Sequence, residues 1–448
     1  ATGTLLMQFL PQLLDPRLLM GEGAVKPVIK ASVATLLGEL VQRMKDYSGT
    51  LVPQTVLYSV SNLRALVVLA CTVMRDNAVA VSAQVVAVKV LYKIVDAIYK
   101  LTDPNNTSRS LLLLALSAIT ERLAWVAEVS PQVLHVFHRT ILQQRAEQTL
   151  QPSYLPATKA SSAAGASAAA GDSAASAAAG VASPAPAAAA AGSDEVPPVT
   201  PLPFAFRPVT ALQGLSQNDV NQLPLDLFAR ANPQGAIVAL QELAHCVMFT
   251  AKPVLWCLNN YRHYTESGAP ASPSQLLPTE VGLIKKLFQA SVSAAVIFSP
   301  TSTYVCEDSY ENAPIAGKLS GVPSVAGGDK QYLSSVATAI TQIHPRTFKE
   351  VMLSCMGFLF EKIVETRWVP LLPLVQSVLS AEPPIAKHFV DVILGFVLTN
   401  IDILLAPAAM SRAAAALFQL VRLTFAQLSA NPELELALKP NWAPLVAQ

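Results

Sequence analysis

The chain has 448 residues, which is long enough for several globular units or for one extended array of repeats. Hydrophobic residues make up 52% and charged residues 14%, so the chain can bury a large core. The 31 basic and 30 acidic side chains leave a net charge of +1. This balance argues against a nucleic-acid-binding surface as the main function.

The cysteines are few and scattered, with no Cys-x-x-Cys pair. An odd number of cysteines in a chain of this length predicts free thiols in a reducing compartment rather than a disulfide framework. The N-terminus has no basic segment before an apolar core, so we expect no signal peptide. We interpret the chain as an interior segment of a longer protein. The five cysteines are Cys71, Cys246, Cys257, Cys306 and Cys355.

The mean hydropathy of +0.42 raises the question of a membrane span. Residues 389–410 form the most apolar candidate, close to the roughly 20 residues that a spanning helix needs. Asp391 and Asp402 would each cost roughly 2.5–3.5 kcal/mol near the bilayer centre, and Pro407 interrupts the segment. We therefore expect no membrane insertion.

The first third of the chain predicts helices, because its apolar residues recur at steps of three and four. Pro27 and Pro53 suit the first position of a helix, where a missing N–H costs nothing. The β-branched residues after Ala80 could form a strand, but the length and period of that run favour a helix. The predicted helices cover residues 27–49, 53–74, 80–99, 111–129 and 131–147, with a turn at 103–106.

Residues 149–203 have a different composition. Alanine, serine and glycine dominate residues 161–192, and prolines recur from Pro184 onward. Such a tract lacks large side chains that could pack, so we predict a disordered insertion.

Beyond this insertion, residues 204–228 are predicted to be irregular, and helical periodicity then returns. The predicted helical segments are residues 236–261 with a kink or break at Pro253, 275–299, 332–365 as a helical hairpin, 369–379, 385–404 and 409–428.

The hairpin at residues 332–365 is the clearest of these segments. His344-Pro345 is predicted to end its first helix, and Thr347 with Glu350 fits a capping box for the second. The apolar face of that second helix is wider than one partner helix could cover, so neighbours are expected on both sides. Its stripe consists of Phe348, Met352, Cys355, Leu359 and Ile363, widened by Val351, Phe358 and Phe360.

These patterns predict an all-α protein built as an irregular HEAT- or armadillo-like α-solenoid of antiparallel helix pairs. The absence of a strict sequence period argues against a regular repeat such as ankyrin. We divide the chain into N-terminal helical repeats (1–148), a low-complexity disordered linker (149–203) and C-terminal helical repeats (204–448).

No residue pattern nominates a catalytic, cofactor or metal site. His135 and His138 share a helix face, but no carboxylate or cysteine lies nearby in sequence. His245 and Cys246, with Cys257, lack the spacing of a structural zinc site. Core cysteines and ordinary surface or packing histidines are the better interpretation.

Phosphate and nucleic-acid signatures are equally weak. Gly21-Glu22-Gly23 begins like a dinucleotide-binding loop, but Lys26 occupies the sixth position and no strand precedes it. Walker, G-x-S-x-G and kinase signatures are not found in the sequence. Lys89, Lys93 and Lys100 are interpreted as a solvated face beside an apolar stripe. No cofactor, small-molecule ligand or direct nucleic-acid partner is expected.

Four stretches, in order, resemble the HEAT-repeat region of the transformation/transcription domain-associated protein family, pseudokinases related to the phosphatidylinositol-3-kinase-like kinases. The P-x-T-F-K-E core after His344 carries the most specific part of the resemblance. The alanine-rich insert and the divergent residues 204–233 depart from the family pattern. The stretches are LLDPRLLMGEG with SVATLLGELVQRMKD, GTLVPQTVLYSV with KVLYKIVDAI, HPRTFKEVMLSCMGFLFEKI, and LFQLVRLTFAQLSANPELELALKPNWAPLV.

The resemblance implies a non-catalytic scaffold in the nucleus. Members of that family hold together histone acetyltransferase complexes of the SAGA and NuA4 types and receive transcription activators, so those subunits and activators are the implied partners. An adaptor of another kind, such as a transport receptor or a regulatory subunit, is the alternative. A solenoid suits either role, because it offers long exposed faces rather than a closed pocket.

Overall fold

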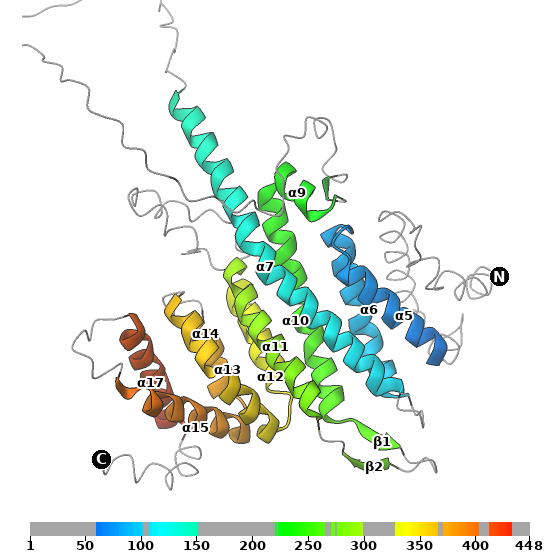
Figure 1. Ribbon diagram of the computed structural model, residues 1–448, viewed down its shortest axis with the longest axis vertical. Coiled ribbons are helices and arrows are strands. Elements are labelled where there is room, and N and C mark those ends of the chain that lie inside the picture. The colour runs from blue at the N-terminus through cyan, green and yellow to red at the C-terminus, as the bar shows by residue number, and fades with distance from the viewer. Residues whose placement is uncertain are drawn as a thin grey trace, which may run out of the picture. The chain divides into compact units, whose positions relative to one another are not determined.

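The computed structural model describes residues 60–101, 107–150, 220–221, 223–264, 270–273, 276–298, 328–365, 371–402 and 412–431. Within these ranges the protein is built from helices, with one short hairpin of strands (Figure 1). The all-α solenoid is therefore confirmed. The sequence-based helices before residue 60, the turn at 103–106 and the linker beyond residue 150 lie outside the described residues.

The helices form consecutive antiparallel pairs, as a solenoid requires. Their bounds are α5 Val60–Arg75, α6 Val81–Tyr99, α7 Thr107–Leu150, α9 Leu225–Ala231, α10 Pro233–Asn259, α11 Pro278–Ala294, α12 Gly328–Ile340, α13 Pro345–Glu365, α14 Leu372–Leu379, α15 Pro383–Thr399 and α17 Arg412–Ala430. A 3₁₀ turn, η2, continues α11 over Ala295–Phe298.

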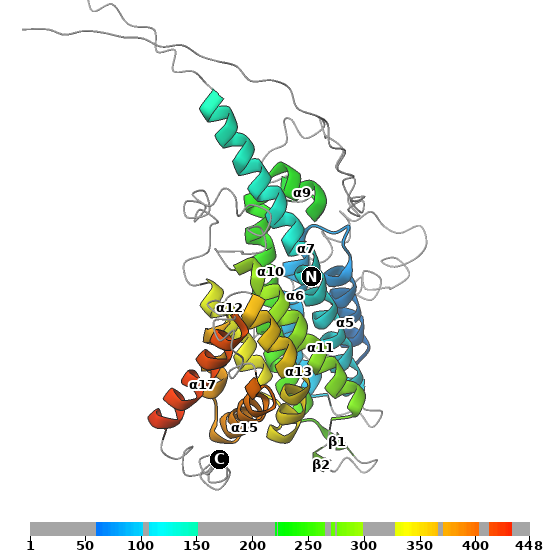
Figure 2. The same ribbon diagram turned by 60° about the vertical axis from the view of Figure 1, so that its left-hand side comes forward.

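Two layers of helices face each other across one hydrophobic core (Figures 1 and 2). In one layer α6 packs on α10, α10 on α12 and α12 on α14. In the other, α11 packs on α13, α13 on α15 and α15 on α17. Each helix therefore buries one face against its neighbours and leaves another at the surface, which matches the wide apolar stripes seen in the sequence.

A small antiparallel hairpin, not predicted from the sequence, connects α10 to α11. Its strands are β1 Arg262–Tyr264 and β2 Pro270–Pro273, and Arg262 pairs with Pro273. Three- and four-residue strands are too short to give a periodic signal in the sequence.

α7 is one continuous helix of 44 residues, so the predicted pair 111–129 and 131–147 is wrong. Pro131 lies inside it and removes one backbone hydrogen bond. Val126 and Leu134, on either side of Pro131, are both buried on the same face. Packing on both sides of Pro131 therefore outweighs its helix-breaking tendency. α10 likewise continues through Pro253, where a kink or break was predicted.

The predicted capping box of Thr347 and Glu350 is also wrong. α13 begins at Pro345, so Thr347 already lies within its first turn. The backbone N–H of Phe348 donates to the carbonyl of His344, 2.9 Å away. Pro345 starts the second helix because its fixed φ and missing N–H suit the first helical position. Half of a capping box forms at the start of α11, where the Glu280 carboxylate accepts from the backbone N–H of Leu277 at 2.8 Å.

Three described helical segments are long and apolar enough to cross a membrane by length and composition: Thr107–Phe137, Pro278–Phe298 and Arg412–Ala430. In the apolar windows of the first two segments, 56% and 61% of the residues are buried inside the protein. The apolar side chains of these segments therefore contribute to the core. The segment expected to be the best candidate, 389–410, is not one helix, since α15 ends at Thr399. Asp391 in α15 pairs with Lys349 of α13 at 3.2 Å.

Candidate interaction surface

Three buried or half-buried polar clusters fix the helices of the solenoid relative to one another. By fixing the helices, these clusters determine which side chains remain at the surface. Each joins residues far apart in sequence, and none of the three groups metal-ligating side chains as a metal site would.

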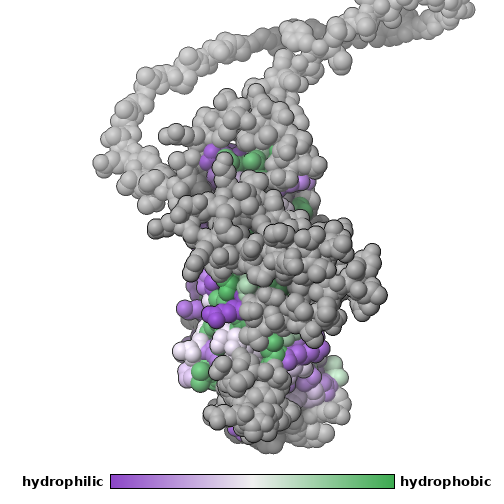
Figure 3. Space-filling view, turned by 90° about the vertical axis from the view of Figure 1, so that its right-hand side faces the viewer, coloured by the Kyte–Doolittle hydropathy of each residue, from purple (hydrophilic) through white to green (hydrophobic). Residues whose placement is uncertain are grey.

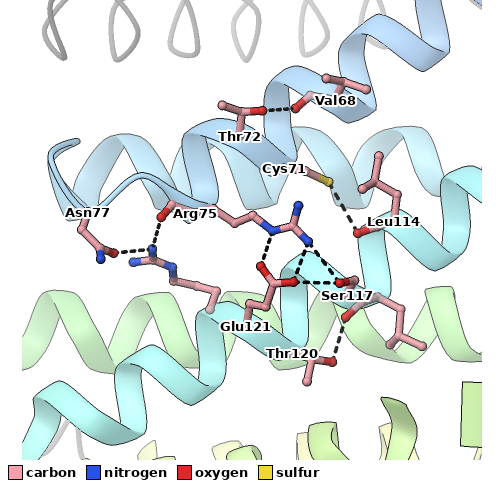
Figure 4. A network of polar contacts seen from close by, with 11 residues as sticks. Val68, Cys71, Thr72, Arg75, Asn77, Leu114, Ser117, Thr120 and Glu121 are labelled. Atoms are coloured by element: carbon pink, nitrogen blue, oxygen red, sulfur yellow. Dashed lines mark hydrogen bonds and ion pairs between the residues drawn. The ribbon is translucent and has the colours of Figure 1, made fainter. Parts of the chain in front are cut away.

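The first cluster anchors α5 to α7 (Figure 4). The guanidinium of Arg75 forms an ion pair with Glu121 at 2.6 Å and donates to the hydroxyl of Ser117 at 3.1 Å. Nearby, the Cys71 thiol lies 4.0 Å from the carbonyl oxygen of Leu114. Burial raises the pKa of Cys71 to about 12, so this thiol stays protonated and acts as a core residue.

The second cluster uses Arg122 of α7 to hold the turn between α5 and α6. Its guanidinium donates to the carbonyl of Arg75 at 2.8 Å, to the side chain of Asn77 at 2.7 Å and to Gln84 at 3.0 Å. It also lies over the ring of Trp125, 4.0 Å from the centroid. A cation at the C-terminal end of α5 offsets the partial negative charge of its carbonyls. Burial lowers the pKa of Arg122 to about 10, which still leaves it charged at neutral pH.

The third cluster joins the start of α7 to the start of α11. Arg109 and Glu280 are 9% and 4% exposed, and their atoms Nη2 and Oε2 lie 2.5 Å apart. A second hydrogen bond of 3.1 Å makes the pair bidentate. The ring of Tyr261 lies below the guanidinium, and its hydroxyl accepts from Ser108. This constellation is structural, because Glu280 has both its oxygens engaged by Arg109 and the backbone of Leu277.

The exposed surface carries a row of aromatic side chains along the seam between α6 and α10. We call Tyr92, Tyr99, His245, Phe249 and Trp256 the aromatic strip. The rings of Tyr92 and Phe249 have centroids 5.0 Å apart, and those of Tyr99 and Trp256 are 5.4 Å apart in an edge-on arrangement. His245 stacks on Phe249 at 6.5 Å.

The aromatic strip is partly open to solvent. Tyr92 is 40%, Phe249 47% and Trp256 44% exposed, so each ring packs on one side and presents the other. Burial lowers the pKa of His245, which keeps its imidazole neutral at pH 7. Among the residues that the structure describes, Nε2 of His245 has no hydrogen-bond partner.

Lysines and carboxylates flank the aromatic strip. Lys89 of α6 pairs with Glu242 of α10 at 2.9 Å across the seam, and Lys100 pairs with Asp96 at 2.7 Å. Lys252 is exposed between Phe249 and Trp256 on α10. Elsewhere, on the face that Figure 3 shows, hydrophobic described side chains also lie beside strongly hydrophilic ones.

The histidines, cysteines and glycines that the sequence analysis weighed as possible ligands have the following positions in the structure. His135 is exposed on α7, and the side chain of His138 is outside the described part. Cys257 is buried and Cys246 half-buried, and burial raises the pKa of both thiols. Across the described ranges, no group of three or more histidine, cysteine or acidic side chains could hold a metal ion. Gly21, Glu22 and Gly23 lie outside those ranges.

The aromatic strip itself was missed by sequence reasoning. The helical period of the sequence places Tyr92 and Tyr99 on one face with Val81, Val85 and Val88, and those valines are buried. The partners of the two tyrosines come from α10, more than 140 positions later in the chain.

Stacked antiparallel helix pairs, structural polar anchors and an exposed apolar strip together define a helical-repeat protein of the scaffold class. The chain belongs to the Tra1 HEAT repeat central region family, whose model matches residues 4–448. The resemblance found in the sequence is thereby confirmed. This family is a repeat scaffold and not a catalytic family. No curated protein sequence matches the chain.

Proposed function

We propose that this chain is a non-catalytic scaffold segment of a nuclear transcription coactivator, which assembles histone acetyltransferase complexes of the SAGA or NuA4 type and docks transcription activators. The observation that carries the proposal is the match of nearly the whole chain to a single scaffold family. Its partners are then proteins, and no nucleic acid, membrane, cofactor or small molecule is required.

The structure supports this proposal through the kind of surface it offers. A two-layer solenoid buries the inner faces of its helices and leaves a row of outer faces for other chains. The polar clusters hold those faces in a fixed arrangement, since each ties helices together with two or more hydrogen bonds or ion pairs. A rigid, extended surface lowers the entropic cost of binding large partners.

The division of the chain into repeats at 1–148 and 204–448, joined by a linker at 149–203, is part of this proposal. Residues 1–141 and 212–448 form one compact unit by their contacts, and 142–211 form another. We propose that the repeats before and after the linker act as one scaffold.

Affinity purification of the tagged full-length protein from nuclear extract, followed by mass spectrometry, tests the proposal. We expect acetyltransferase-complex subunits to be recovered, and microscopy to place the protein in the nucleus. Recovery of transport cargo or of an unrelated catalytic subunit, without any acetyltransferase-complex subunit, would favour the alternative adaptor role and reject the proposal.

A further inference from the structure

The last described helix, α17, has an apolar face that the described part of the protein leaves open. Only 33% of the residues in its apolar window are buried, against 56% and 61% in the two other apolar segments. Phe418 is 60% exposed, and Phe425, about two turns further along the helix, is 47% exposed. Large apolar side chains that recur on one helix face at this exposure indicate a contact surface.

The position of α17 in the solenoid shows where its cover is missing. α13 packs between α11 and α15, and α15 packs between α13 and α17. α17 stands at the end of this layer (Figures 1 and 2), and its contacts run to α13, α14 and α15, which all precede it in the chain. In a solenoid each repeat is covered by the one that follows it, so the chain after α17 is the expected cover.

The chain after α17 has the composition that this cover needs. Leucines and one tryptophan recur in residues 432–448, where carboxylates outnumber lysines. α17 has the opposite charge, with Arg412 and Arg422 exposed and no carboxylate of its own. The two segments are therefore complementary in both apolar surface and charge. The side chains of the segment are Leu434, Leu436, Leu438, Trp442 and Leu445, with Glu433, Glu435 and Lys439.

The segment is also long enough to reach the whole apolar face. Phe418 lies thirteen residues before Asn431, which is about 20 Å along a helix axis. The seven residues that follow Asn431 can extend over about 23 Å, so even Leu438 can reach Phe418. A segment tethered this closely has an effective concentration in the millimolar range, so contacts too weak to join separate chains are sufficient.

We propose that residues 432–448 of this chain fold back on α17, where their leucines cover Phe418 and Phe425 and their carboxylates face Arg422. A second copy of the chain fits this face less well, because it would bring further arginines and no carboxylate from its own α17. The family match extends through residue 448, so the covering segment belongs to the same repeat region. This cover does not depend on the proposed scaffold role, and it withdraws the α17 face from the surfaces open to other proteins.

Photo-crosslinking in the chain of 448 residues tests the contact. Benzoyl-phenylalanine is introduced in place of Phe418 or Phe425 and, as a control, in place of Leu353 of α13, which is also 60% exposed. After irradiation, monomers are separated from crosslinked dimers, and mass spectrometry identifies the joined peptides. We expect the probes at positions 418 and 425 to crosslink to residues 432–448 of the same molecule, and the probe at position 353 to form no such crosslink.

A double variant of the segment and its matched control locate the apolar contact, with the probe at position 418. Leu436→Asp with Leu438→Asp should lower the crosslink yield by at least about fivefold, because two apolar side chains are replaced by charges. Lys439→Asp with Asn441→Asp introduces the same two side chains but removes no apolar one, so it should change the yield by less than about twofold. A circular dichroism melt of each variant verifies that the helices are intact.

Three results would overturn the proposal. The first is a lack of crosslinks from positions 418 and 425 to residues 432–448, or an equal yield from position 353. The second is crosslinked dimers in place of joined monomers, which would assign the face to a second copy. The third is flotation of the chain with vesicles of phosphatidylcholine and phosphatidylserine, abolished by Phe418→Asp, which would assign the face to a membrane. None of them affects the recovery of acetyltransferase-complex subunits, so the two proposals can fail separately.

Discussion

Arg109 and Glu280 are 171 positions apart in the sequence, and they form a buried ion pair in the solenoid. A buried pair adds little stability over apolar residues of similar size, because both charges have lost their water. Its effect appears when one partner is removed, since the other is then left charged and uncompensated. Glu280 also accepts the backbone N–H of Leu277, so the pair connects helix capping to the packing of α7 on α11.

Glu280→Gln should lower the free energy of unfolding by about 3–5 kcal/mol. The amide keeps the shape and can still accept from Leu277, so the loss reports the uncompensated charge of Arg109. Chemical denaturation followed by circular dichroism measures it.

The double variant Arg109→Met with Glu280→Gln should recover a large part of that stability, because no charge remains buried. The exposed pair is the control: Glu242→Gln removes one partner of Lys89 and should cost less than about 1 kcal/mol. Equal losses at the buried and the exposed pair would contradict the structural role assigned to Arg109 and Glu280.

At the scale of single elements, packing decides where helices begin and end. Pro131 and Pro253 lie inside α7 and α10, although proline costs an isolated helix about 3 kcal/mol. Buried side chains on both sides of each proline keep the helix continuous, among them Val126 and Leu134 in α7 and Ala251 and Val254 in α10. A break would expose those side chains, which costs more than one backbone hydrogen bond.

α13 offers a direct test of which face is buried. Leu359 is 1% exposed and Leu353, on the same helix, is 60% exposed. Leu359→Asp should unfold the hairpin of α12 and α13, because an unpaired carboxylate in the core has no compensation. Leu353→Asp should change stability by less than about 0.5 kcal/mol.

A circular dichroism melt of both variants distinguishes the two faces. We expect the Leu359 variant to lose much of its melting temperature and the Leu353 variant to match the original. A Leu359→Asp protein that melts unchanged would refute the placement of this face.

At the scale of the whole molecule, the solenoid is interrupted by a stretch that the sequence predicts to be dispensable. Residues 161–192 consist almost entirely of alanine, serine and glycine, which offer little apolar area to bury. The repeats on both sides of it share one compact unit, so the chain must leave and re-enter that unit.

Deleting residues 161–192 should therefore leave the thermal melting temperature almost unchanged. Residues 151–160 and 193–211 would still connect α7 to the later repeats, and the entropic cost of closing a loop changes only slowly with its length. Differential scanning calorimetry of the deleted and full chains makes the comparison. A drop of more than about 5 °C would show that the insertion contributes to the folded unit.

The sequence by itself determined the fold class and most of the helices, because their apolar residues recur with the period of an α-helix over many turns. It also determined the family, through motifs such as the P-x-T-F-K-E core, and it predicted that no catalytic or metal-binding set would be found. These properties are local: they depend on residues close together in the sequence and can be predicted without knowing which helices pack against one another.

The tertiary structure alone decided the continuity of α7 through Pro131, the start of α13 at Pro345 and the pairing of Arg109 with Glu280. It also brought Tyr92 and Tyr99 of α6 beside Phe249 and Trp256 of α10. Each of these features depends on contacts between residues distant in the chain, whose free energy no local pattern encodes. The aromatic strip is therefore a property of the packed solenoid and not of any one helix.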